Sequence, residues 1–539
     1  MIKRFAARLK NEFKGYNAAS LGKDLMAGIT VAAVALPLAL AFGVSSGADA
    51  AAGLITAIIG GIVISALSGA SFQISGPTGA MTAVLITIVS KYQLQGVFIV
   101  SLMAGIMLLI AGICKLGKII SIIPMPVITG FTSGIAIIIA LGQIDNFFGT
   151  HSEGESAIQK LMSYGELGFS PNWQAVIVGL IVVAVMILWP KKWNAKVPSS
   201  LIGIIVAAII SSLAGFEVAQ VGAIPRTLFP ETRLDLTAID FSAIPSLISP
   251  AITIAALGMI ESLLCGASAS RMKDESFDAD QELIAQGVGN ILIPFFGGVP
   301  ATAAIARTSV AIKAGCQTRL TGIFHAVGLL LSMFLLGGIM SKLPLSALAG
   351  VLMVTAWRMN EWHSIKYIFK NKFVSAILQF IITMVCTVLF DLTIAIVIGV
   401  AFAMILFIKS CITINVSTSK VENSKLTYSD SDVESSNKGT TVAYITGMLF
   451  FANIDRLKEL LNEVHPEDTL ILSMRGVAGL DMGGAKGLIE IIEDYRKENT
   501  QVLLCGLNDK VKETLLRTDV DNTVDENCIF WSVDRALLR

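Results

Sequence analysis

Runs of about 17 to 22 residues with almost no charge recur in this chain from Leu25 to about Cys411. An α-helix of that length crosses the hydrocarbon core of a bilayer, which is about 30 Å thick. Only 15% of the 539 residues are charged and 54% are hydrophobic, whereas soluble domains usually carry about 25% charged residues. The sequence therefore predicts an all-α polytopic membrane domain.

The uncharged runs predict about fourteen transmembrane segments. The expected segments are 25–45, 48–68, 77–91, 96–114, 119–141, 173–190, 199–216, 250–267, 281–298, 301–314, 321–340, 343–358, 373–390 and 391–412. They make up a transmembrane domain over 25–412, which follows a basic, amphipathic N-terminal segment over 1–24. A polar stretch over 413–440 indicates a linker. The remainder, 441–539, alternates apolar strands with helices near 454–463, 484–497 and 509–517, which predicts a small α/β domain.

Basic residues predict the orientation of the segments, because short loops rich in Lys and Arg stay in the cytoplasm. Basic clusters precede the first segment and follow the even-numbered segments from the fourth onward: Lys3, Arg4, Arg8, Lys10 and Lys14; Lys115 and Lys118; Lys191, Lys192 and Lys196; Arg271 and Lys273; Lys313 and Arg319; the region from Arg358 to Lys372; and Lys409. The long loop near 142–172 is poor in both residues. We therefore expect a bacterial inner-membrane protein with both termini in the cytoplasm.

Two segments look too short to cross as simple helices. They open at 71–83 and 297–313, each with a Gly-x-Pro or Gly-Gly-x-Pro break. They are the third segments of two halves, about 25–216 and 250–412, and such matched interruptions are typical of inverted-repeat transporters. Backbone amides exposed at a broken helix are tolerated where they line a cavity, and there they attract anions. The alternative is that Gly and Pro only kink packed helices.

The broken segments supply the candidate substrate-binding residues. In the first, Pro77 precedes Thr78, Gly79 and Ala80, where a hydroxyl and small side chains let a ligand approach the backbone. In the second, the helix start is expected at Ala301, Thr302, Ala303 and Ala304. Arg307 follows one turn later as a permanent cation within an apolar stretch, and it either attracts an anion or pairs with an acid.

Glu261 is the clearest acid within an apolar helix, in ALGMIESLLCGASASR. An apolar environment favours the uncharged form of a carboxyl, so Glu261 is our candidate for a group that couples transport to a proton. The alternative is a permanent Glu261–Arg307 ion pair that holds two helices together. We expect Asp24 to be a helix-start residue, Asp391 an extracellular turn residue and His325 a packed or hydrogen-bonded residue.

Several classes of function lack their sequence signals. There is no Walker motif for an ATP-driven pump, and the four histidines and seven cysteines lack metal-ligand or CxxC spacing. A net charge of zero gives no basic field for nucleic acid. We therefore expect no cofactor, no metal and no nucleic-acid partner, and we do not expect an enzyme.

The motifs together resemble the sulfate permease (SulP) family of anion transporters with a C-terminal STAS domain. The matching segments are AGITVAAVALPLALAFG (27–43), SFQISGPTGAMTAVL (71–85), FTSGIAI (131–137), ALGMIESLLCGA (256–267), GVGNILIPFFGGVPATAAIARTSVAIKAG (287–315) and LPLSALAGVLMVTAW (343–357). The resemblance implies a seven-plus-seven inverted repeat with core and gate domains, an elevator-like motion and a homodimer. It also implies that the substrate is surrounded by Thr78, Gly79, Glu261, Ala303, Ala304 and Arg307.

Four positions depart from patterns within the family. In the family that this chain resembles, many sulfate-type members have Gln or Glu at the position of Leu38. Glu261 and Cys265 stand where sodium-coupled bicarbonate members tend to have Asp and a hydroxyl, so the resemblance favours a proton over sodium. Gly483 stands where the related phosphorylation switch has Ser, so we expect no such switch here.

These features lead to one functional hypothesis and several alternatives. We expect a secondary active, proton-coupled symporter of a small anion such as a C4-dicarboxylate, sulfate or bicarbonate. The alternatives within transport are a sodium-coupled bicarbonate transporter, an anion exchanger, an anion channel or a nucleobase permease, although the last resembles proteins without a STAS tail. An alternative of another class is a membrane sensor that signals through the STAS domain. The expected partners are the anion, a proton or sodium ion, the lipid bilayer, a second copy of the chain and a cytoplasmic protein bound to the STAS domain.

Overall fold

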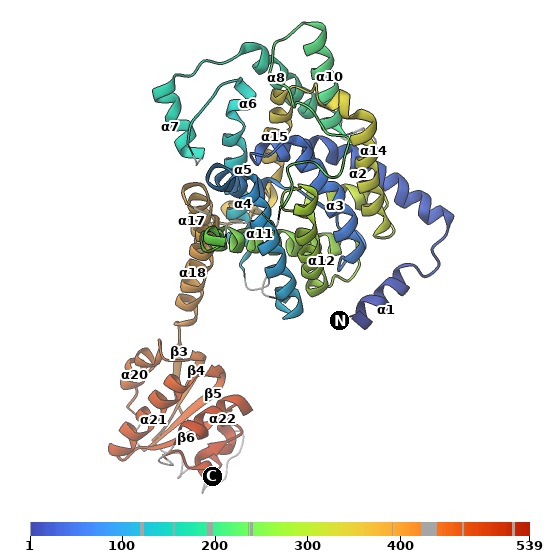
Figure 1. The fold of residues 1–539 in the computed structure, drawn as a ribbon. Coiled ribbons are helices and arrows are strands. Elements are labelled where there is room, and N and C mark those ends of the chain that lie inside the picture. The colour runs from blue at the N-terminus through green and yellow to red at the C-terminus, as the bar shows by residue number, and fades with distance from the viewer. Residues whose placement is uncertain are drawn as a thin grey trace. The chain divides into compact units, whose positions relative to one another are not determined.

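The chain folds into two units, one over 1–401 and one over 402–539. The computed structural model describes residues 2–118, 123–154, 157–190, 198–235, 237, 241–390, 392–421, 439–465, 468–519 and 523–538. The N-terminal unit is built mainly of helices and the C-terminal unit contains a twisted sheet (Figure 1). The predicted loop residues Lys191, Lys192, Lys196 and Asp391 lie outside the described residues.

Most helices of the N-terminal unit follow the uncharged runs of the sequence, and the last of them crosses residue 401 into the second unit. Their bounds are α1 Ile2–Glu12, α2 Ala18–Ser45, α3 Ala50–Leu67, α4 Gly79–Ile113, α5 Met125–Gly142, α6 Ile144–Phe148, α7 Ala157–Leu167, α8 Trp173–Leu188, α10 Ser199–Leu213, α11 Ile244–Lys273, α12 Ala279–Leu292, α13 Ile305–Lys313, α14 Leu320–Met340, α15 Leu345–Met359, α16 Trp362–Lys370, α17 Val374–Leu389 and α18 Leu392–Cys411. Two 3₁₀ turns, η3 Phe241–Ala243 and η4 Ile293–Phe296, precede α11 and follow α12.

Each predicted segment contains a helix, although several boundaries differ, most of all at two places. The segments predicted at 77–91 and 96–114 join as α4, which kinks at Gln93, where φ is 56° and ψ is −170°. The segment predicted at 301–314 starts later, because α13 begins at Ile305. By length and composition, seven helices within the described residues are long and apolar enough to cross a membrane, and α8, α10, α15 and α17 are shorter apolar helices. The seven-plus-seven repeat stays a prediction.

Glycines let the helices that carry the site approach one another closely. A Cβ added to Gly105 of α4 would lie 2.8 Å from the carbonyl oxygen of Gly287 on α12. A Cβ on Gly287 would lie 2.6 Å from the backbone nitrogen of Leu109. Both distances are shorter than side chains tolerate, so the two backbones touch directly. Gly105 and Gly287 are therefore positions of close helix packing.

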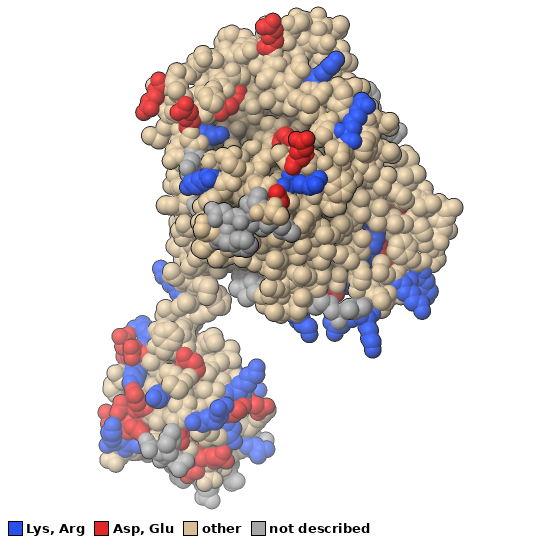
Figure 2. All heavy atoms as spheres, viewed as in Figure 1, with Lys and Arg blue, Asp and Glu red and all other residues tan. Residues whose placement is uncertain are grey.

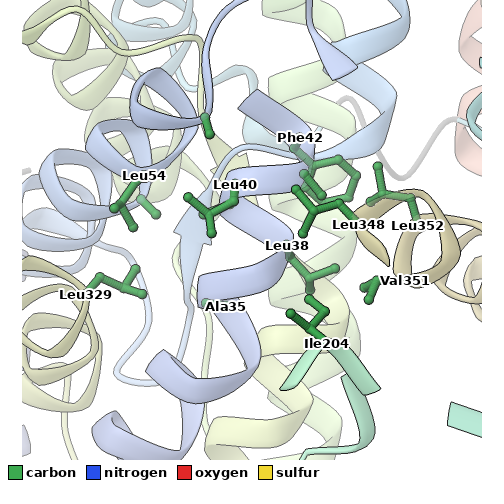
Figure 3. Packing of buried hydrophobic residues seen from close by; sticks show 14 of the residues in the cluster. Ala35, Leu38, Leu40, Phe42, Leu54, Ile204, Leu329, Leu348, Val351 and Leu352 are labelled. Carbon is green, nitrogen blue, oxygen red and sulfur yellow. The ribbon is translucent and has the colours of Figure 1, made fainter. Parts of the chain in front are cut away.

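The largest apolar cluster joins α2, α3, α10, α14 and α15. Figure 3 shows its centre, where leucine, isoleucine, valine and phenylalanine side chains of these helices point toward one another. The labelled members are Ala35, Leu38, Leu40, Phe42, Leu54, Ile204, Leu329, Leu348, Val351 and Leu352. Their dispersion contacts fix the positions of α2 and α3 relative to each other. The chain continues from α3 into the candidate site.

Asp24 has a different role from the one predicted. It lies in the second turn of α2, which begins at Ala18, and its side chain is fully buried. Its carboxylate accepts hydrogen bonds from the backbone nitrogens of Gln317 and Thr318 and from the hydroxyls of Thr318 and Thr321. Asp24 therefore caps the start of α14, and Thr318, one of its partners there, lies 294 residues later in the chain. It does not start its own helix.

The C-terminal unit contains a five-stranded sheet in the order β3-β4-β5-β6-β7. The strands are β3 Asn415–Lys420, β4 Thr440–Leu449, β5 Thr469–Leu480, β6 Gln501–Cys505 and β7 Ile529–Phe530, and the helices are α20 Ile454–Asn462, α21 Met482–Lys497, α22 Asp509–Thr518 and α23 Val533–Leu537, with the 3₁₀ turn η6 Glu526–Cys528. β4 to β7 pair in parallel, and β3 pairs antiparallel with β4. Helices follow the parallel strands, as the alternating pattern predicts.

The predicted linker is shorter than expected. Within 413–440, the residues of β3 pair with β4 from Asn415↔Thr446 to Lys420↔Thr441. The sequence of β3, NVSTSK, is polar because the strand lies at the edge of the sheet and most of its side chains are exposed. A polar edge strand and a linker therefore look alike in sequence.

Candidate functional site

Two helices begin inside the N-terminal unit at the predicted breaks. α4 begins at Gly79 with Thr78 as its N-cap, and α13 begins at Ile305 with Ala304 as its N-cap. Neither N-cap side chain accepts a hydrogen bond from the first turn of its helix. The partial positive charge of about half a unit at each start is therefore not offset by a capping group.

A short pair of strands brings the two helix starts together. β1, Ser75–Gly76, pairs antiparallel with β2, Thr302–Ala303, in the register Ser75↔Ala303 and Gly76↔Thr302. The backbone nitrogen of Ala304 also donates to the carbonyl oxygen of Ile74 at 3.0 Å. α4 follows β1 and α13 follows β2 in the chain, so the N-terminal ends of both helices, which carry partial positive charge, lie next to the same pair of strands.

Amide side chains of α12 hold this element in place. Nε2 of Gln286 donates to Oγ of Ser75 at 2.9 Å, and Asn290 exchanges two hydrogen bonds with the backbone of Ala301, at 2.8 and 2.9 Å. Sequence reasoning missed these residues. The available signal was QELIAQGVGN, in which Glu282, Gln286 and Asn290 recur every four residues and so share one face of an apolar helix.

α11 supports the same element from another side. The hydroxyls of Ser262 and Thr302 lie 2.7 Å apart, and Oγ of Ser262 accepts a hydrogen bond from the backbone nitrogen of Ala303 at 3.3 Å. Nε2 of Gln73 donates to the carbonyl oxygen of Ser262 at 2.8 Å. Ser262 follows Glu261 directly, so these contacts also fix the backbone position from which Glu261 extends.

Arg307, on α13, packs against β1, and only 1% of its surface is exposed. Nη2 donates to the carbonyl oxygen of Pro77 at 2.9 Å, while Nη1 has no hydrogen-bond partner among the described residues. A Cβ added to Gly76 would lie 2.6 Å from Nη1, so the guanidinium lies against the backbone of β1. A buried guanidinium with an unused N–H is costly unless a further acceptor completes it.

Glu261 contacts the start of α4 directly. Its Oε2 accepts a hydrogen bond from Oγ1 of Thr78 at 2.8 Å. Among the described residues no ion pair within 4.0 Å joins Glu261 to Arg307, in contrast to the alternative of a permanent pair. The carboxyl is therefore held by a neutral hydroxyl.

The remaining sequence candidates lie around these contacts. Gly79 and Ala80 form the first turn of α4, where a Cβ on Gly79 would lie 2.1 Å from Cδ1 of Ile139 on α5. Ala303 and Ala304 belong to β2 and the α13 N-cap. His325 is fully buried, as expected, but neither ring nitrogen has a hydrogen-bond partner among the described residues.

The arrangement has the chemistry of a site for a small anion. Two uncapped helix starts and one permanent cation supply positive potential, and one carboxyl can add or remove a negative charge. The described residues contain no group of three His, Cys, Asp or Glu side chains that could hold a metal ion.

Comparisons with known proteins agree with this architecture. The sulfate permease family matches residues 21–386, and the STAS domain matches residues 434–536. A Bacillus subtilis protein, YvdB, which is described provisionally as a sulfate transporter, is 34% identical over 97% of this chain and 98% of its own length. The bicarbonate transporter BicA of Picosynechococcus is 28% identical over 95% of this chain and 94% of its own length.

Solved structures show the same fold. The structure of SLC26A9 superposes with a TM-score of 0.83 over 98% of this chain and 91% of that chain, at 19% identity. The transmembrane domain of the cyanobacterial bicarbonate transporter BicA gives a TM-score of 0.65 over 71% of this chain and 98% of that chain, at 31% identity. With a family match over most of its length and a relative that aligns from end to end, this chain belongs to the sulfate permease family of membrane anion transporters and carries a C-terminal STAS domain.

Proposed function

We propose that this protein is a secondary active symporter that moves one small anion together with a proton. The observation that carries the proposal is the pairing of Ser75–Gly76 with Thr302–Ala303, which brings two uncapped helix starts to one element beside Arg307. An anion bound there would accept hydrogen bonds from first-turn amides, and the helix dipoles would add attraction. Thr78, Gly79, Ala80, Ala303, Ala304 and Arg307 are the proposed substrate-binding residues.

Glu261 is the proposed coupling residue. It touches Thr78, the N-cap of α4, so an ionised Glu261 would lie close to a bound anion. Two unit negative charges about 6 Å apart repel by roughly 3 kcal/mol at an effective dielectric constant of about 20, which is a factor of roughly one hundred in affinity. Protonation removes this repulsion. The anion and the proton therefore favour each other's binding, which is what a symporter requires.

The substrate class is a C4-dicarboxylate, sulfate or bicarbonate. YvdB is described provisionally as a sulfate transporter and BicA as a bicarbonate transporter, so both anions are candidates here. All three fit a site whose donors are backbone amides and one guanidinium, because these groups recognise carboxylate and sulfate oxygens alike. The 28% identity to BicA favours bicarbonate transport, with sodium or a proton, as the second candidate function.

The proposed setting is a bacterial inner membrane, with both termini in the cytoplasm and two copies of the chain in a dimer. The STAS domain is proposed to bind a cytoplasmic protein without a phosphorylation switch at Gly483. A Cβ there would lie 2.8 Å from Cβ of Phe451, so a serine would need the Phe451 segment to move. Glycine has no hydroxyl that can be phosphorylated, and this crowding around residue 483 supports the expectation that the position carries no phosphorylation switch.

Uptake into proteoliposomes tests the proposal. The purified full chain is reconstituted, and labelled sulfate, succinate and bicarbonate are offered under an imposed proton gradient, sodium gradient or neither. We expect one of these anions to accumulate above its equilibrium level only when the exterior is more acidic. Accumulation driven by sodium alone indicates the sodium-coupled transporter, and flux that only equilibrates indicates a channel or an exchanger. An absence of flux for every anion contradicts the transport proposal and favours a sensor.

A further inference from the structure

The N-terminal helix α1 is attached to the bundle by one face. The ring of Phe5 packs under the guanidinium of Arg319 at 5.2 Å, and Arg8 donates to the carbonyl oxygen of Gly69. Glu12 accepts hydrogen bonds from Nε and Nη2 of Arg319 at 3.0 and 2.8 Å, and this ion pair is almost fully buried. These contacts recur every three to four residues, so they fix the rotation of α1 about its axis.

The opposite face of α1 is basic. Lys3, Arg4 and Lys10 are exposed there, together with Ala6, Ala7 and Asn11, and Lys14 is exposed two residues after the helix ends at Glu12. Glu12 is the only acid between residues 1 and 23, and Arg319 already engages it. Figure 2 shows basic side chains gathered at the end of the N-terminal unit where α1 lies. The outward face of α1 therefore carries cations that no acid of the helix offsets.

α1 lies at one end of the helix bundle, beside an exposed apolar surface of α2. Its contacts are with Gly69, just after α3 ends, and with Arg319, just before α14 begins, so it packs at one end of the bundle. α2 starts only a few residues after α1, and its exposed side chains from the first turns onward are large and apolar: Leu21, Leu25, Met26 and Ile29. Lipid tails cover such a surface, and the headgroups lie at its end.

We propose that the basic face of α1, formed by Lys3, Arg4 and Lys10, binds the anionic headgroups of phospholipids such as phosphatidylglycerol, together with Lys14 in the turn that follows the helix. The apolar face of an ordinary interfacial helix enters the bilayer, whereas here the protein covers that face and only the cations meet the lipid. The headgroup phosphates supply the acceptors that α1 itself lacks. The neighbouring apolar surface of α2 favours lipid over a soluble protein as the occupant.

The site also has a physical link to the transport machinery, and this part rests on the proposed function. Arg319 donates from Nη1 to the carbonyl oxygens of Ala66 and Ser68 at 2.9 and 3.2 Å. These residues end α3 and start the segment that continues directly into β1. A lipid bound on α1 would therefore keep the Glu12–Arg319 ion pair in place, and this pair anchors the segment between α3 and β1.

Native mass spectrometry of the full chain tests the lipid site without any transport measurement. The protein is offered equimolar phosphatidylglycerol and phosphatidylcholine, and the retained lipids are counted. One variant changes Lys3, Arg4, Lys10 and Lys14 to Gln. A matched control changes four cations of the C-terminal unit, Lys486, Lys510, Lys512 and Arg535, to Gln. All four residues of the first set are exposed, so folding is expected to be unchanged.

Each cation near an anionic lipid surface contributes roughly a five-fold gain in binding, so the wild type should retain phosphatidylglycerol over phosphatidylcholine by about ten-fold or more. The α1 variant should lose at least about five-fold of that preference, and the control should keep it. Equal preference in the wild type and the α1 variant would overturn the proposal. An equal loss in the α1 variant and the control would overturn it too, because the preference would then reflect overall charge. Either result leaves the proposed anion site unaffected.

Discussion

Replacing Gly76 with Ala perturbs Arg307 without removing its charge. A Cβ at residue 76 would lie 2.6 Å from Nη1 of Arg307, 3.3 Å from Cζ and 3.4 Å from Cα of Ala57. An ordinary contact between such atoms is about 3.5 to 4.0 Å, so the guanidinium must move by roughly 1 Å. Gly76 has a φ of +159°, which L residues rarely adopt, so alanine also strains the backbone of β1. Pairing with β2 and Gln286 holds that backbone in place, so the side chain of Arg307 yields to the new methyl group.

The shift should weaken anion binding by a measurable factor. Nη2 of Arg307 donates to the carbonyl oxygen of Pro77 at 2.9 Å, and a 1 Å displacement breaks this bond and moves the charge away from the helix starts. Nη1, which has no hydrogen-bond partner among the described residues, would also be displaced from the anion proposed to bind it. A hydrogen bond from a charged donor contributes about 1.5 to 3 kcal/mol, which corresponds to about ten- to one-hundred-fold in affinity. We therefore expect the KM for the transported anion to rise by about ten-fold or more.

The assay is initial-rate uptake into proteoliposomes as a function of anion concentration. Gly338→Ala is the matched control, because no atom lies within 4 Å of a Cβ at that position of α14. In an Arg307→Lys background, Gly76→Ala should raise KM by a smaller factor, since lysine lacks the atom that the new methyl meets and only the backbone strain at residue 76 remains. The reasoning is refuted if Gly76→Ala leaves KM unchanged, or if its effect is the same in the lysine background.

Three further predictions concern other parts of the molecule. Glu261→Gln should abolish uptake driven by a proton gradient while anion exchange persists, because glutamine mimics the protonated carboxyl; an unchanged response to the gradient in liposomes would contradict the coupling role. Glu12→Gln should destabilise the N-terminal unit by about 3 kcal/mol in thermal unfolding because Arg319 stays buried without its partner, whereas Arg456→Gln, at an exposed pair, should cost less than about 1 kcal/mol. Burial raises the pKa of Tyr495 to about 12, with a smaller contribution from a nearby carboxylate, so its neutral hydroxyl stabilises the C-terminal unit below pH 10 and this stability is lost as pH rises toward 12. The denaturation midpoint of the wild type should therefore fall more between pH 10 and 12 than that of Tyr495→Phe, and equal slopes would refute this.

Features written in short stretches of sequence could be predicted. The helices follow the uncharged runs, because a lipid-facing helix must be apolar over its whole length. The breaks before Gly79 and Ile305 follow Gly and Pro, which interrupt a helix locally. The α/β pattern of the C-terminal unit was likewise predictable, because strands and helices differ in hydrophobic period.

Features that depend on distant partners could not be predicted. Gln286 and Ser75 are 211 residues apart, and no local pattern indicates that they meet. Asp24 resembles a helix-start residue in sequence, but its partners lie at the start of α14. The pairing of β1 with β2 involves only two residues in each strand, which is too short to produce a period.

The central claim is that the starts of α4 and α13 and Arg307 hold one anion between them. A structure determined with selenate or bromosuccinate, whose heavy atom gives an anomalous signal, tests this most directly. We predict one anomalous peak between the two helix starts and near Nη1 of Arg307, with oxygen atoms of the anion within hydrogen-bond distance of the first-turn amides of both helices, and a weaker peak in Gly76→Ala at the same anion concentration. A peak bound elsewhere in the N-terminal unit, with the two helix starts left empty, would contradict the account.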